Sequence, residues 1–274
     1  MEVLDNIPLR LSLEEVSNKA RLPKENKTLK KTIDELIEIA LDRGGNRVAK
    51  EICVGISFVG VLLDNGSMGL AYTFREELKP WCNVIEKAGQ LETYVSELLP
   101  LARSLDVLDS AVGVATINAV LKPDEYEEGD TLDFLSIKEK DTVVMVGYMK
   151  PLVERLTNKV RRLYVIERTA KNENIYPDWT ASILIPKADV VIISGTAVVN
   201  KTVDHLLSLS RKAREVAIVG PTTPLAPTVF KKRRVTLLSG VMVTNPKRAM
   251  KVIAQGGGTR NLRNYVKKVN VILK

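Results

Sequence analysis

The run DVVIIS at residues 189–194 is a short, almost uninterrupted series of β-branched and aliphatic residues. Four further runs of this kind lie along the second half of the chain: TVVMV at 142–146, RLYVIE at 162–167, EVAIVG at 215–220 and VTLLSG at 235–240. Helical or loop segments separate them. Near-continuous apolar strands that alternate with crossovers are typical of a parallel sheet covered on both faces. The pattern predicts an α/β fold with a Rossmann-like parallel sheet.

The first half of the chain shows other periodicities. Residues 32–41 carry apolar side chains at helical intervals, Thr32 and Glu35 have the spacing of a capping box, and Gly44-Gly45 ends the segment. Apolar residues alternate from Ile52 to Leu62 and again from Met68 to Tyr72, on either side of a turn at 64–66, which predicts a β-hairpin. This part is therefore expected to be a smaller α+β domain.

Two more helices are predicted at 91–103 and 107–121. The second, VLDSAVGVATINAVL, is rich in small residues, which permit close approach to a neighbouring element. We place the domain boundary at Asp106, so that residues 1–105 form the small α+β domain and residues 106–274 the Rossmann-like domain.

The net charge of +8 is unevenly distributed over the 274 residues. Residues 1–140 carry 17 Lys and Arg against 25 Asp and Glu, a charge of −8, and residues 141–274 carry 24 against 8, a charge of +16. This asymmetry is consistent with two domains that attract one another, with a basic face for an anionic partner, or with a solubilising surface.

Several classes of function are disfavoured. No apolar stretch approaches the roughly 18 residues of a membrane-spanning helix and the N-terminus lacks an apolar signal segment, so we expect a cytoplasmic protein that does not contact a membrane. Cys53 and Cys82 do not form a CxxC motif, and the single histidine, His205, lies in a helical pattern where a surface position is expected. We therefore predict no metal-ligating residues.

The residues that follow the predicted strands indicate a ligand site, because ligands of doubly wound sheets bind beyond the carboxyl ends of the strands. Glycines there allow close backbone approach, and hydroxyls and helix N-terminal amides suit an anion; ordinary turns are also rich in these residues. Neither GxGxxG nor GxxxxGK[ST] occurs. The candidate ligand-binding residues are Gly147, Tyr148, Pro151, Ser194, Gly195, Thr196, Asn200, Gly220, Pro221, Thr222, Thr223, Ser239 and Gly240.

If the site is catalytic, Glu167 and Asp178 are the candidates for general acid and base and Lys150 for a cationic stabiliser. Glu167 ends the second strand, where a ribose-binding acid lies in dinucleotide-binding domains. Asp178 belongs to the segment YPDW at 176–179, which is either an aromatic lid over a flat ligand or a packed turn.

One glycine-rich segment and two basic runs remain. The segment QGGGTR at 255–260 is either an anion-binding loop or a flexible link into the last helix. The basic runs at 231–234 and 260–268 contain a single aromatic residue, Tyr265. We expect a solvated surface at these runs, which makes nucleic acid an unlikely partner.

Seven segments resemble the microbial family called putative heavy-metal chelation. They are SAVGVATINAVL (110–121), VGYMKPLVERL (146–156), VIER (165–168), YPDW (176–179), ADVVIISGTAVVNKTVDHLL (188–207), REVAIVGPTTPL (214–225) and LLSGVMVTNP (237–246). The preceding part resembles the enolase N-terminal-like domain that often accompanies this family.

The resemblance implies two domains with a ligand site in the cleft between them. The positions that match the family's motifs are Asn118, Gly147, Pro151, Glu167, Asp178, Gly195, Thr196, Asn200, Gly220, Pro221, Thr222 and Gly240. Asn118 thereby joins the candidate ligand-binding residues.

Three functions follow as hypotheses. The first is the binding of a small anionic or nucleotide-like ligand, with or without catalysis in small-molecule or chelator metabolism. The second is metal handling, and the third is nucleic-acid binding through the basic C-terminal half. The cofactor is left open, and a homo-oligomer is compatible with the sequence.

Overall fold

The large sheet of the protein is mixed and has six parallel strands. The computed structural model describes residues 30–79, 85, 88–168 and 175–273. Within it, residues Lys31–Lys274 form one unit, which all of the following concerns. The strand order of the large sheet is β4-β11-β10-β9-β8-β5-β6-β7, in which β5 to β10 run parallel and β11 and β4 are antiparallel to their neighbours.

The α/β fold predicted from the sequence is confirmed, and all five predicted strands are present. The strands of the large sheet are β4 (Glu127–Glu128), β5 (Thr142–Val146), β6 (Arg162–Ile166), β7 (Ile175–Tyr176), β8 (Val190–Ser194), β9 (Glu215–Val219), β10 (Leu237–Val243) and β11 (Val266–Ile272). The sequence did not predict the short edge strands β4 and β7, or β11, which makes the sheet mixed. The Rossmann-like and enolase N-terminal-like labels stay predictions.

Both faces of the large sheet are covered. In β5, Val143 and Met145 pack into the core that includes Leu152 and Leu156 of α5, whereas Val144 faces a second core that includes helices α2, α4, α7 and α8. This two-sided burial explains why the strands read as continuous apolar runs. The helices of this part are α5 (Lys150–Leu156), α6 (Ala181–Leu184), α7 (Thr196–Val199), α8 (Val203–Leu209), α9 (Pro227–Phe230), α10 (Pro246–Ala254) and α11 (Thr259–Leu262).

The short 3-10 helices of the described residues complete the chain between these elements. They are η1 (Arg75–Glu77), η2 (Leu99–Arg103), η3 (Thr131–Phe134), η4 (Asp178–Thr180), η5 (Ile185–Lys187), η6 (Ser210–Lys212) and η7 (Lys231–Arg233).

A second, three-stranded antiparallel sheet precedes the large one in sequence. It consists of β1 (Ala49–Val54), β2 (Phe58–Leu63) and β3 (Met68–Tyr72) in the order β1-β2-β3. The predicted hairpin is confirmed as β2–β3. The single strand expected from Ile52 to Leu62 is wrong, because the chain turns back at residues 55–57 and forms two paired strands there.

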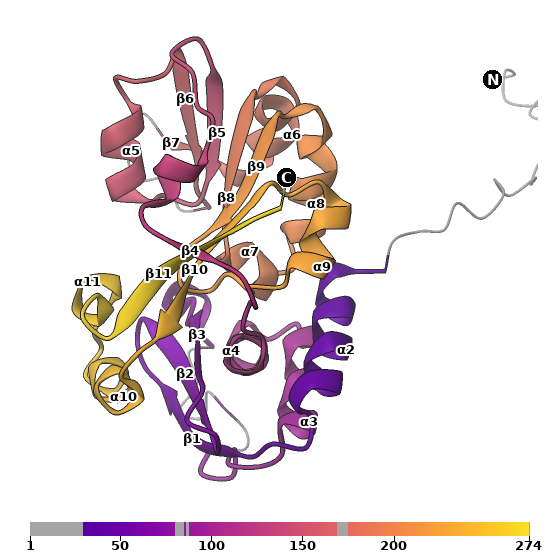
Figure 1. Cartoon of the computed structure of the whole chain (residues 1–274), viewed down its shortest axis with the longest axis vertical. Coiled ribbons are helices and arrows are strands. Elements are labelled where there is room, and N and C mark those ends of the chain that lie inside the picture. The colour runs from indigo at the N-terminus through magenta and orange to yellow at the C-terminus, as the bar shows by residue number, and fades with distance from the viewer. Residues whose placement is uncertain (1–29, 80–84, 86–87, 169–174, 274) are drawn as a thin grey trace, which may run out of the picture. The chain divides into compact units, whose positions relative to one another are not determined.

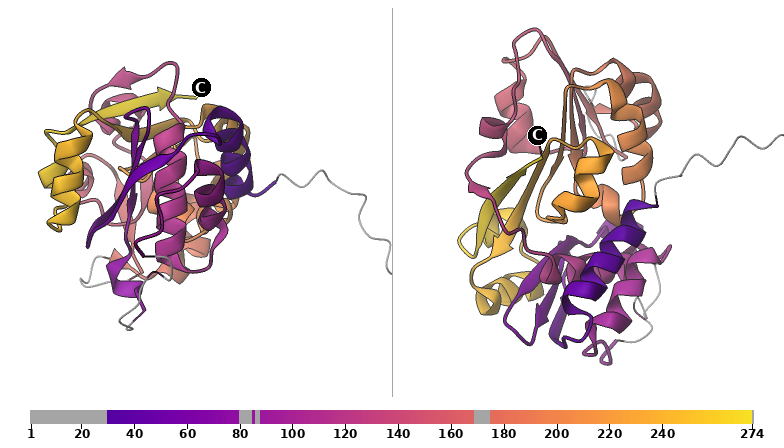
Figure 2. Two further views of the ribbon diagram at one scale, coloured as in Figure 1. Left: turned by 90° about the horizontal axis from the view of Figure 1, so that it is seen from below. Right: turned by 45° about the vertical axis from the view of Figure 1, so that its right-hand side comes forward.

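Helices cover the small sheet on both sides (Figure 1). On one side lie α2 (Thr32–Gly44), α3 (Val95–Leu98) and α4 (Val107–Val120), and on the other α10 and α11; Figure 2 shows the same layers from below. The small residues of α4 allow the expected close approach, since a Cβ at Gly69 of β3 would lie 2.1 Å from the carbonyl oxygen of Ala115. The predicted boundary at Asp106 assigns α4 to the second domain although it packs on β2 and β3; the boundary stays a prediction.

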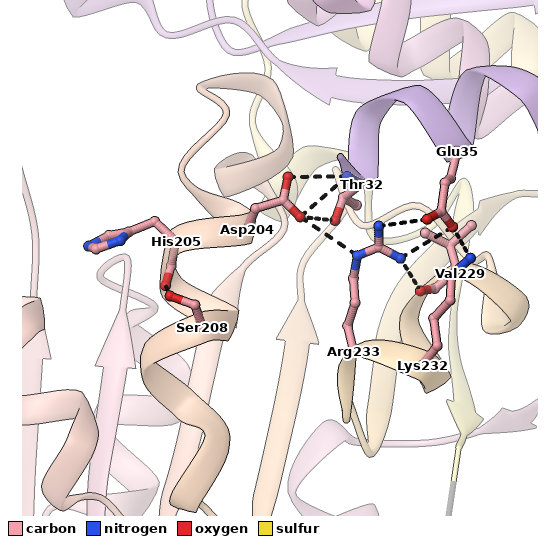
Figure 3. A network of polar contacts seen from close by, with 8 residues as sticks. All are labelled: Thr32, Glu35, Asp204, His205, Ser208, Val229, Lys232 and Arg233. Atoms are coloured by element: carbon pink, nitrogen blue, oxygen red, sulfur yellow. Dashed lines mark hydrogen bonds and ion pairs between the residues drawn. The ribbon is translucent and has the colours of Figure 1, made fainter. Parts of the chain in front are cut away.

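The N-terminus of α2 is fixed by a residue from α8, which corrects the predicted capping box (Figure 3). Asp204 accepts hydrogen bonds from the backbone N–H of Thr32, at 3.1 Å, and from its hydroxyl. Glu35 instead pairs with Arg233, at 3.0 Å, and with Lys232, and Arg233 also lies 3.6 Å from Asp204. The run at 231–234, expected to be a solvated surface, therefore contributes the buried Arg233 to an interelement contact.

His205 is exposed on α8, as predicted, and Figure 3 shows its ring pointing away from these contacts.

Candidate functional site

The order of the chain through the large sheet reverses between β5 and β8. From β5 the chain proceeds to β6 and β7 on one side, and then to β8, β9 and β10 on the other. Gly147 follows β5 and Ser194 ends β8, and a Cβ at Gly147 would lie 2.7 Å from the Cβ of Ser194. Ligands of open α/β sheets bind outside the carboxyl ends of the strands at such a switch point. We call the loops at these strand ends the carboxyl edge.

Glu167 follows β6 on one flank of the switch point. Its carboxylate accepts hydrogen bonds from the backbone N–H groups of Tyr148 and Arg168, both at 2.9 Å. The Arg168 guanidinium turns away and pairs with Glu77 of η1 at 2.7 Å. Glu167 is therefore held in place by backbone amides, and Arg168 does not neutralise it directly.

Tyr72, at the end of β3, brings the small sheet to the carboxyl edge. Burial raises the pKa of its hydroxyl, and the negative charges of Glu76 and, more weakly, Glu167 add to this effect. The Tyr72 hydroxyl lies 3.4 Å from the Glu76 carboxylate. Tyr72 is not among the site residues predicted from the sequence; its position at the end of a predicted strand was the available signal.

The segment 194–196 is tightly built. The Ser194 hydroxyl oxygen accepts hydrogen bonds from the hydroxyl of Thr196 at 2.8 Å and from its backbone N–H at 3.4 Å. Gly195 donates to Val219, and a Cβ at Gly195 would lie 2.6 Å from the backbone nitrogen of Thr223. No side chain larger than hydrogen fits there without displacing the loop that follows β9.

That loop, residues 220–223, joins β9 to the small sheet and to α4. The Thr222 hydroxyl oxygen accepts a hydrogen bond from the backbone N–H of Tyr72 at 3.0 Å, and its carbonyl accepts one from the Asn118 amide at 3.1 Å. Gly220 has φ of 116°, and a Cβ there would meet nothing within 4 Å. There is thus free space beside the backbone of Gly220, whereas Thr222 is occupied by its hydrogen bonds to Tyr72 and Asn118.

Asn118 and Thr223 line a small cavity between β3, α4 and the loop after β9. The Asn118 amide nitrogen donates to the carbonyls of Leu70, at 2.8 Å, and of Thr222, which fixes the amide orientation. The amide oxygen of Asn118 and the hydroxyl of Thr223 are buried and have no hydrogen-bond partner in the structure. The cavity measures about 10 Å³, about the space that the centre of one water molecule needs.

Many of the backbone amides expected to hold an anion are already used within the carboxyl edge. Gly147 donates to Ile166, Gly195 to Val219, Gly220 to Ser239 and Thr223 to Gly220. The groups that remain at the edge are therefore mainly side chains: the Glu167 carboxylate, the Ser194 hydroxyl and the exposed Tyr148 ring, which is 44% exposed.

Three of the predicted residues lie apart from this arrangement. The Lys150 side chain is exposed and lies 3.7 Å from Glu154, one turn along α5. Pro151 is exposed in the first turn of α5, and Asp178 is exposed at the start of η4. The structure does not bring Lys150 or Asp178 into contact with Glu167.

The other predicted residues have structural contacts. The amide oxygen of Asn200 accepts hydrogen bonds from the backbone and hydroxyl of Thr202 in a local turn. Ser239 bonds Thr131 at 2.6 Å, and Gly240 lies against Leu225. Because β10 extends to Val243 rather than ending near Gly240, Ser239 and Gly240 lie within a strand and not in a loop after it. Pro221, which lines the small cavity, is half-buried.

Two half-buried lysines near α4 were missed. The ammonium of Lys122 donates to the carbonyls of Asn118, at 3.0 Å, and Met68, at 3.2 Å, and burial lowers its pKa to about 8. Lys201, with φ of 63°, donates to Val199 at 2.8 Å and to Ser110, and burial lowers its pKa to about 8 as well. Nothing in a local pattern distinguishes these lysines from exposed ones.

The segment YPDW is partly packed and partly exposed. Tyr176 contacts Tyr164 edge to face, with ring centroids 5.5 Å apart, whereas Trp179 is 67% exposed. Tyr176 thus has the contact expected of a packed turn, whereas Trp179 has the exposure expected of a lid. Cys82 lies outside the described residues.

Two family models match the chain, and both are described as putative heavy-metal chelation. One covers residues 130–272, more than half of the sequence, and the other residues 20–121. The chain belongs to the putative heavy-metal chelation family. The resemblance inferred from the seven segments is thereby confirmed.

Relatives found by sequence and by structure are described as uncharacterised or of unknown function. An uncharacterised protein of Methanocaldococcus jannaschii is 28% identical over 191 residues, 67% of this chain and 73% of the relative. The crystal structure of a protein of unknown function from Pyrococcus horikoshii is 27% identical, has a TM-score of 0.78 and covers 88% of this chain and 99% of its own. One from Desulfitobacterium hafniense is 24% identical, with a TM-score of 0.76 and coverages of 89% and 99%.

The described residues do not form a binding site for the heavy metal to which the family's name refers. Among them, no three side chains of His, Cys, Asp or Glu lie together as metal ligands. His205 is exposed, and Cys53 is half-buried on β1 with a pKa raised by burial and by Glu51, so its reactive thiolate form is disfavoured. A soft metal prefers thiolate and imidazole ligands in a shared shell.

A larger hollow lies away from the carboxyl edge. It measures about 570 Å³ and is lined by Leu132, Leu135, Ile137, Arg155 and Asn158, among others. These residues precede β5 and β6, so the hollow is at the amino ends of the strands.

In the part of the chain that the structure describes, no helix is long and apolar enough to span a membrane.

Proposed function

We propose that this protein binds a small nucleotide-like molecule at the carboxyl edge, where the large sheet faces β3 and α4. The observation that carries the proposal is the switch point between β5 and β8, with Gly147 and Ser194 in contact across it. Glu167 on the neighbouring strand suits a ligand hydroxyl. The exposed Tyr148 ring, next in sequence to Gly147, suits a flat group.

An anionic group of the ligand would lie beside Gly220 and the hydroxyls of Ser194 and Thr196. Gly220 leaves open space, and the Ser194 hydroxyl, which accepts both bonds from Thr196, retains its own proton for donation. The unpartnered oxygens of Asn118 and Thr223 add a place for one water molecule at the inner end of the site.

The test is a thermal-shift screen with nucleotides, adenosylmethionine-like compounds, pterins and metal chelates, followed by calorimetric titration of the best ligand. A ligand that binds only the folded state raises the melting temperature, because the free energy of unfolding increases by RT ln(1 + [L]/Kd). For Glu167→Gln we expect at least about a tenfold weaker Kd, the effect of losing a hydrogen bond to a charged group. The matched control is Glu154→Gln on α5, whose carboxylate faces solvent.

Absence of stabilisation by every compound contradicts the proposal. An equal affinity of Glu167→Gln and Glu154→Gln would place the ligand elsewhere. Metal handling is a second hypothesis, which the family name supports and the donor inventory opposes; stoichiometric metal in untagged protein that is lost on mutating Cys53 or His205 would favour it.

A further inference from the structure

The C-terminal part of the chain lacks acidic residues. Glu215 is the last of them, and residues 216–274 contain twelve Lys and Arg and no Asp or Glu. Some of these cations are paired with acids from earlier parts of the chain, namely Lys232 and Arg233 with Glu35, Lys267 with Glu128, and Lys268 with Asp130. The remaining ones are not distributed evenly.

Five of the remaining cations lie on the helical hairpin formed by α10 and α11. They are Lys247, Arg248, Lys251, Arg260 and Arg263, and all five are exposed. We call them the α10–α11 basic face. Lys247 and Lys251 are four residues apart and Arg260 and Arg263 three, spacings that put side chains on one side of a helix.

No carboxylate among the described residues lies within ion-pair distance of the α10–α11 basic face. Glu51, on the neighbouring strand β1, forms no ion pair with it in the structure, and Glu215 is the last acid of the sequence. The face is therefore a concentration of uncompensated positive charge, unlike the run at 231–234, where Arg233 is buried against Glu35.

The hairpin is firmly attached to the small sheet. Ala249, Met250, Ile253 and Leu262 are buried against Phe58, Met68 and Leu70 of β2 and β3. A Cβ at Gly60 would lie 2.7 Å from the side chain of Ile253. The apolar side of the hairpin is thus occupied, and the five cations lie on its exposed side. Figure 1 shows α10 and α11 beside the small sheet.

The glycines between the two helices shape the turn and do not hold an anion with their amides. Gly256 donates to Ile253 at 2.9 Å, Gly257 to Val252 at 2.8 Å and Gly258 to the side chain of Asn261 at 3.3 Å. Of the two interpretations of QGGGTR, anion binding through the loop backbone is therefore disfavoured, and the side chains of the hairpin are left as the binding groups.

Contrary to the expectation of a solvated surface at residues 260–268, we propose that the α10–α11 basic face binds the phosphodiester backbone of a nucleic-acid duplex. Lys and Arg, with Thr and Asn such as Thr259 and Asn264 beside them, are the groups that contact phosphates. Tyr265, the single aromatic of the hairpin region, is half-buried, so the face lacks the stacking platform of single-strand binders. Because the contacts are made to phosphates, we expect the affinity to be independent of the base sequence.

This interaction does not depend on the proposed function. The basic face lies on α10, which packs on β1 and β2, and on α11, which packs on α10, whereas the carboxyl edge contacts β3 and α4. Loss of one activity therefore leaves the other measurable.

The test is fluorescence anisotropy of a labelled 20-base-pair DNA duplex titrated with the full chain at several salt concentrations. Five phosphate contacts predict a slope of log K against log salt of about −4.5. The variant Lys247→Glu/Arg248→Glu/Arg260→Glu is expected to bind at least about tenfold more weakly at 50 mM salt, with a shallower slope. Circular dichroism shows whether the variant is folded.

The matched control carries the same change of charge on another surface. Lys187→Glu/Arg211→Glu/Lys212→Glu alters η5 and η6 and is expected to change the affinity less than about threefold. Equal losses in the two variants would show a mere net-charge effect and overturn the proposal, as would absence of binding at 50 mM salt.

Two further outcomes also decide the question. Tighter binding of oligo(dT) than of the duplex would overturn duplex recognition. Phosphatidylserine vesicles are the membrane alternative, because the exposed Ile56 lies beside Gly256; vesicles that bind at the same salt concentration and displace the duplex would assign the face to a lipid surface. Failure of the vesicles to compete supports the nucleic acid.

Discussion

Two polar regions connect the elements around the small sheet to the large sheet, and they differ in how completely their groups are paired. The Arg233 junction consists of Thr32, Glu35, Asp204, Lys232 and Arg233, and in it each charge lies beside an opposite one (Figure 3). The Asn118 junction consists of Tyr72, Asn118, Lys122, Thr222 and Thr223, and it leaves two buried oxygens without partners and an ammonium on carbonyls alone.

This difference separates a structural contact from a candidate site. Buried polar groups in folded proteins are almost always satisfied, so those left unsatisfied indicate an additional water or ligand group. The Arg233 junction needs no such group. The Asn118 junction adjoins the carboxyl edge, which is where a ligand of an open α/β sheet is expected.

The largest predicted effect is the loss of Arg233. Its side chain is 5% exposed and that of Glu35 is 9% exposed, and removing one partner of a buried pair typically destabilises by about 3–5 kcal/mol. Arg233→Met is therefore expected to lower the free energy of unfolding by that amount in urea titrations. In Glu35→Leu/Arg233→Met most of this loss should be recovered, because no buried charge is left unpaired; the side chains of Lys232 and Asp204, which lose their charged partners, are 44% and 42% exposed.

Acid should weaken the same junction. Burial acts to raise the pKa of Glu35, but the hydrogen bonds and charges of Arg233 and Lys232 outweigh it, so the pKa lies below its usual 4.5. A depressed carboxyl pKa contributes stability above the ordinary value, which is lost as the pH falls through the folded one. An unchanged stability of Arg233→Met at pH 7 would contradict the role of the junction.

The next effect concerns Lys122 and pH. Burial lowers its pKa from 10.5 to about 8, so between these values the unfolded chain binds more protons than the folded one. Stability should therefore rise with pH across that window, by about 2–3 kcal/mol for a shift of this size. Lys201 contributes in the same direction.

Lys122→Met is expected to reduce this rise to the part that Lys201 contributes, measured by urea unfolding at pH 7, 8.5 and 10. The control Lys159→Met changes an exposed lysine and should leave the slope as it is. If the stability of Lys122→Met rises with pH as steeply as that of the wild type, the Lys122 ammonium is not buried as described.

The smallest effect is the loss of the α2 cap. Asp204→Ala removes the acceptor of the Thr32 backbone and hydroxyl and is expected to destabilise by about 1–2 kcal/mol, the range for N-cap removal. Asp204→Asn keeps an acceptor and should lose less. His205→Ala, next to it but pointing away, should remain near the wild type; a loss equal to that of Asp204→Ala would contradict the cap.

Local patterns predicted the strands well and long-range contacts poorly. β5 matches its predicted range at both ends because a two-sided buried strand is marked by its own residues. The capping box failed because the partner of Thr32 is Asp204, 172 positions away, a distance that no local pattern contains. The additional turn at residues 55–57 also went unseen between two similar apolar runs.

The site shows the same division. Gly147, Ser194 and Gly220 were predicted because each directly follows or ends a strand, whereas Tyr72 and Lys122 enter only through tertiary packing. Lys150 and Asp178 have suitable sequence positions, but their side chains face solvent. One matched family range ends at residue 121 and the other begins at residue 130. Because α4 also packs on β2 and β3, we propose that the domain boundary lies between these two residues.

The most direct test of the account is a crystal structure of the protein with the compound that stabilises it most. Binding at the carboxyl edge predicts density in contact with Glu167, Ser194 and Gly220, and an ordered water between Asn118 and Thr223. Density confined to the 570 Å³ hollow beside Arg155, at the amino ends of the strands, would contradict it.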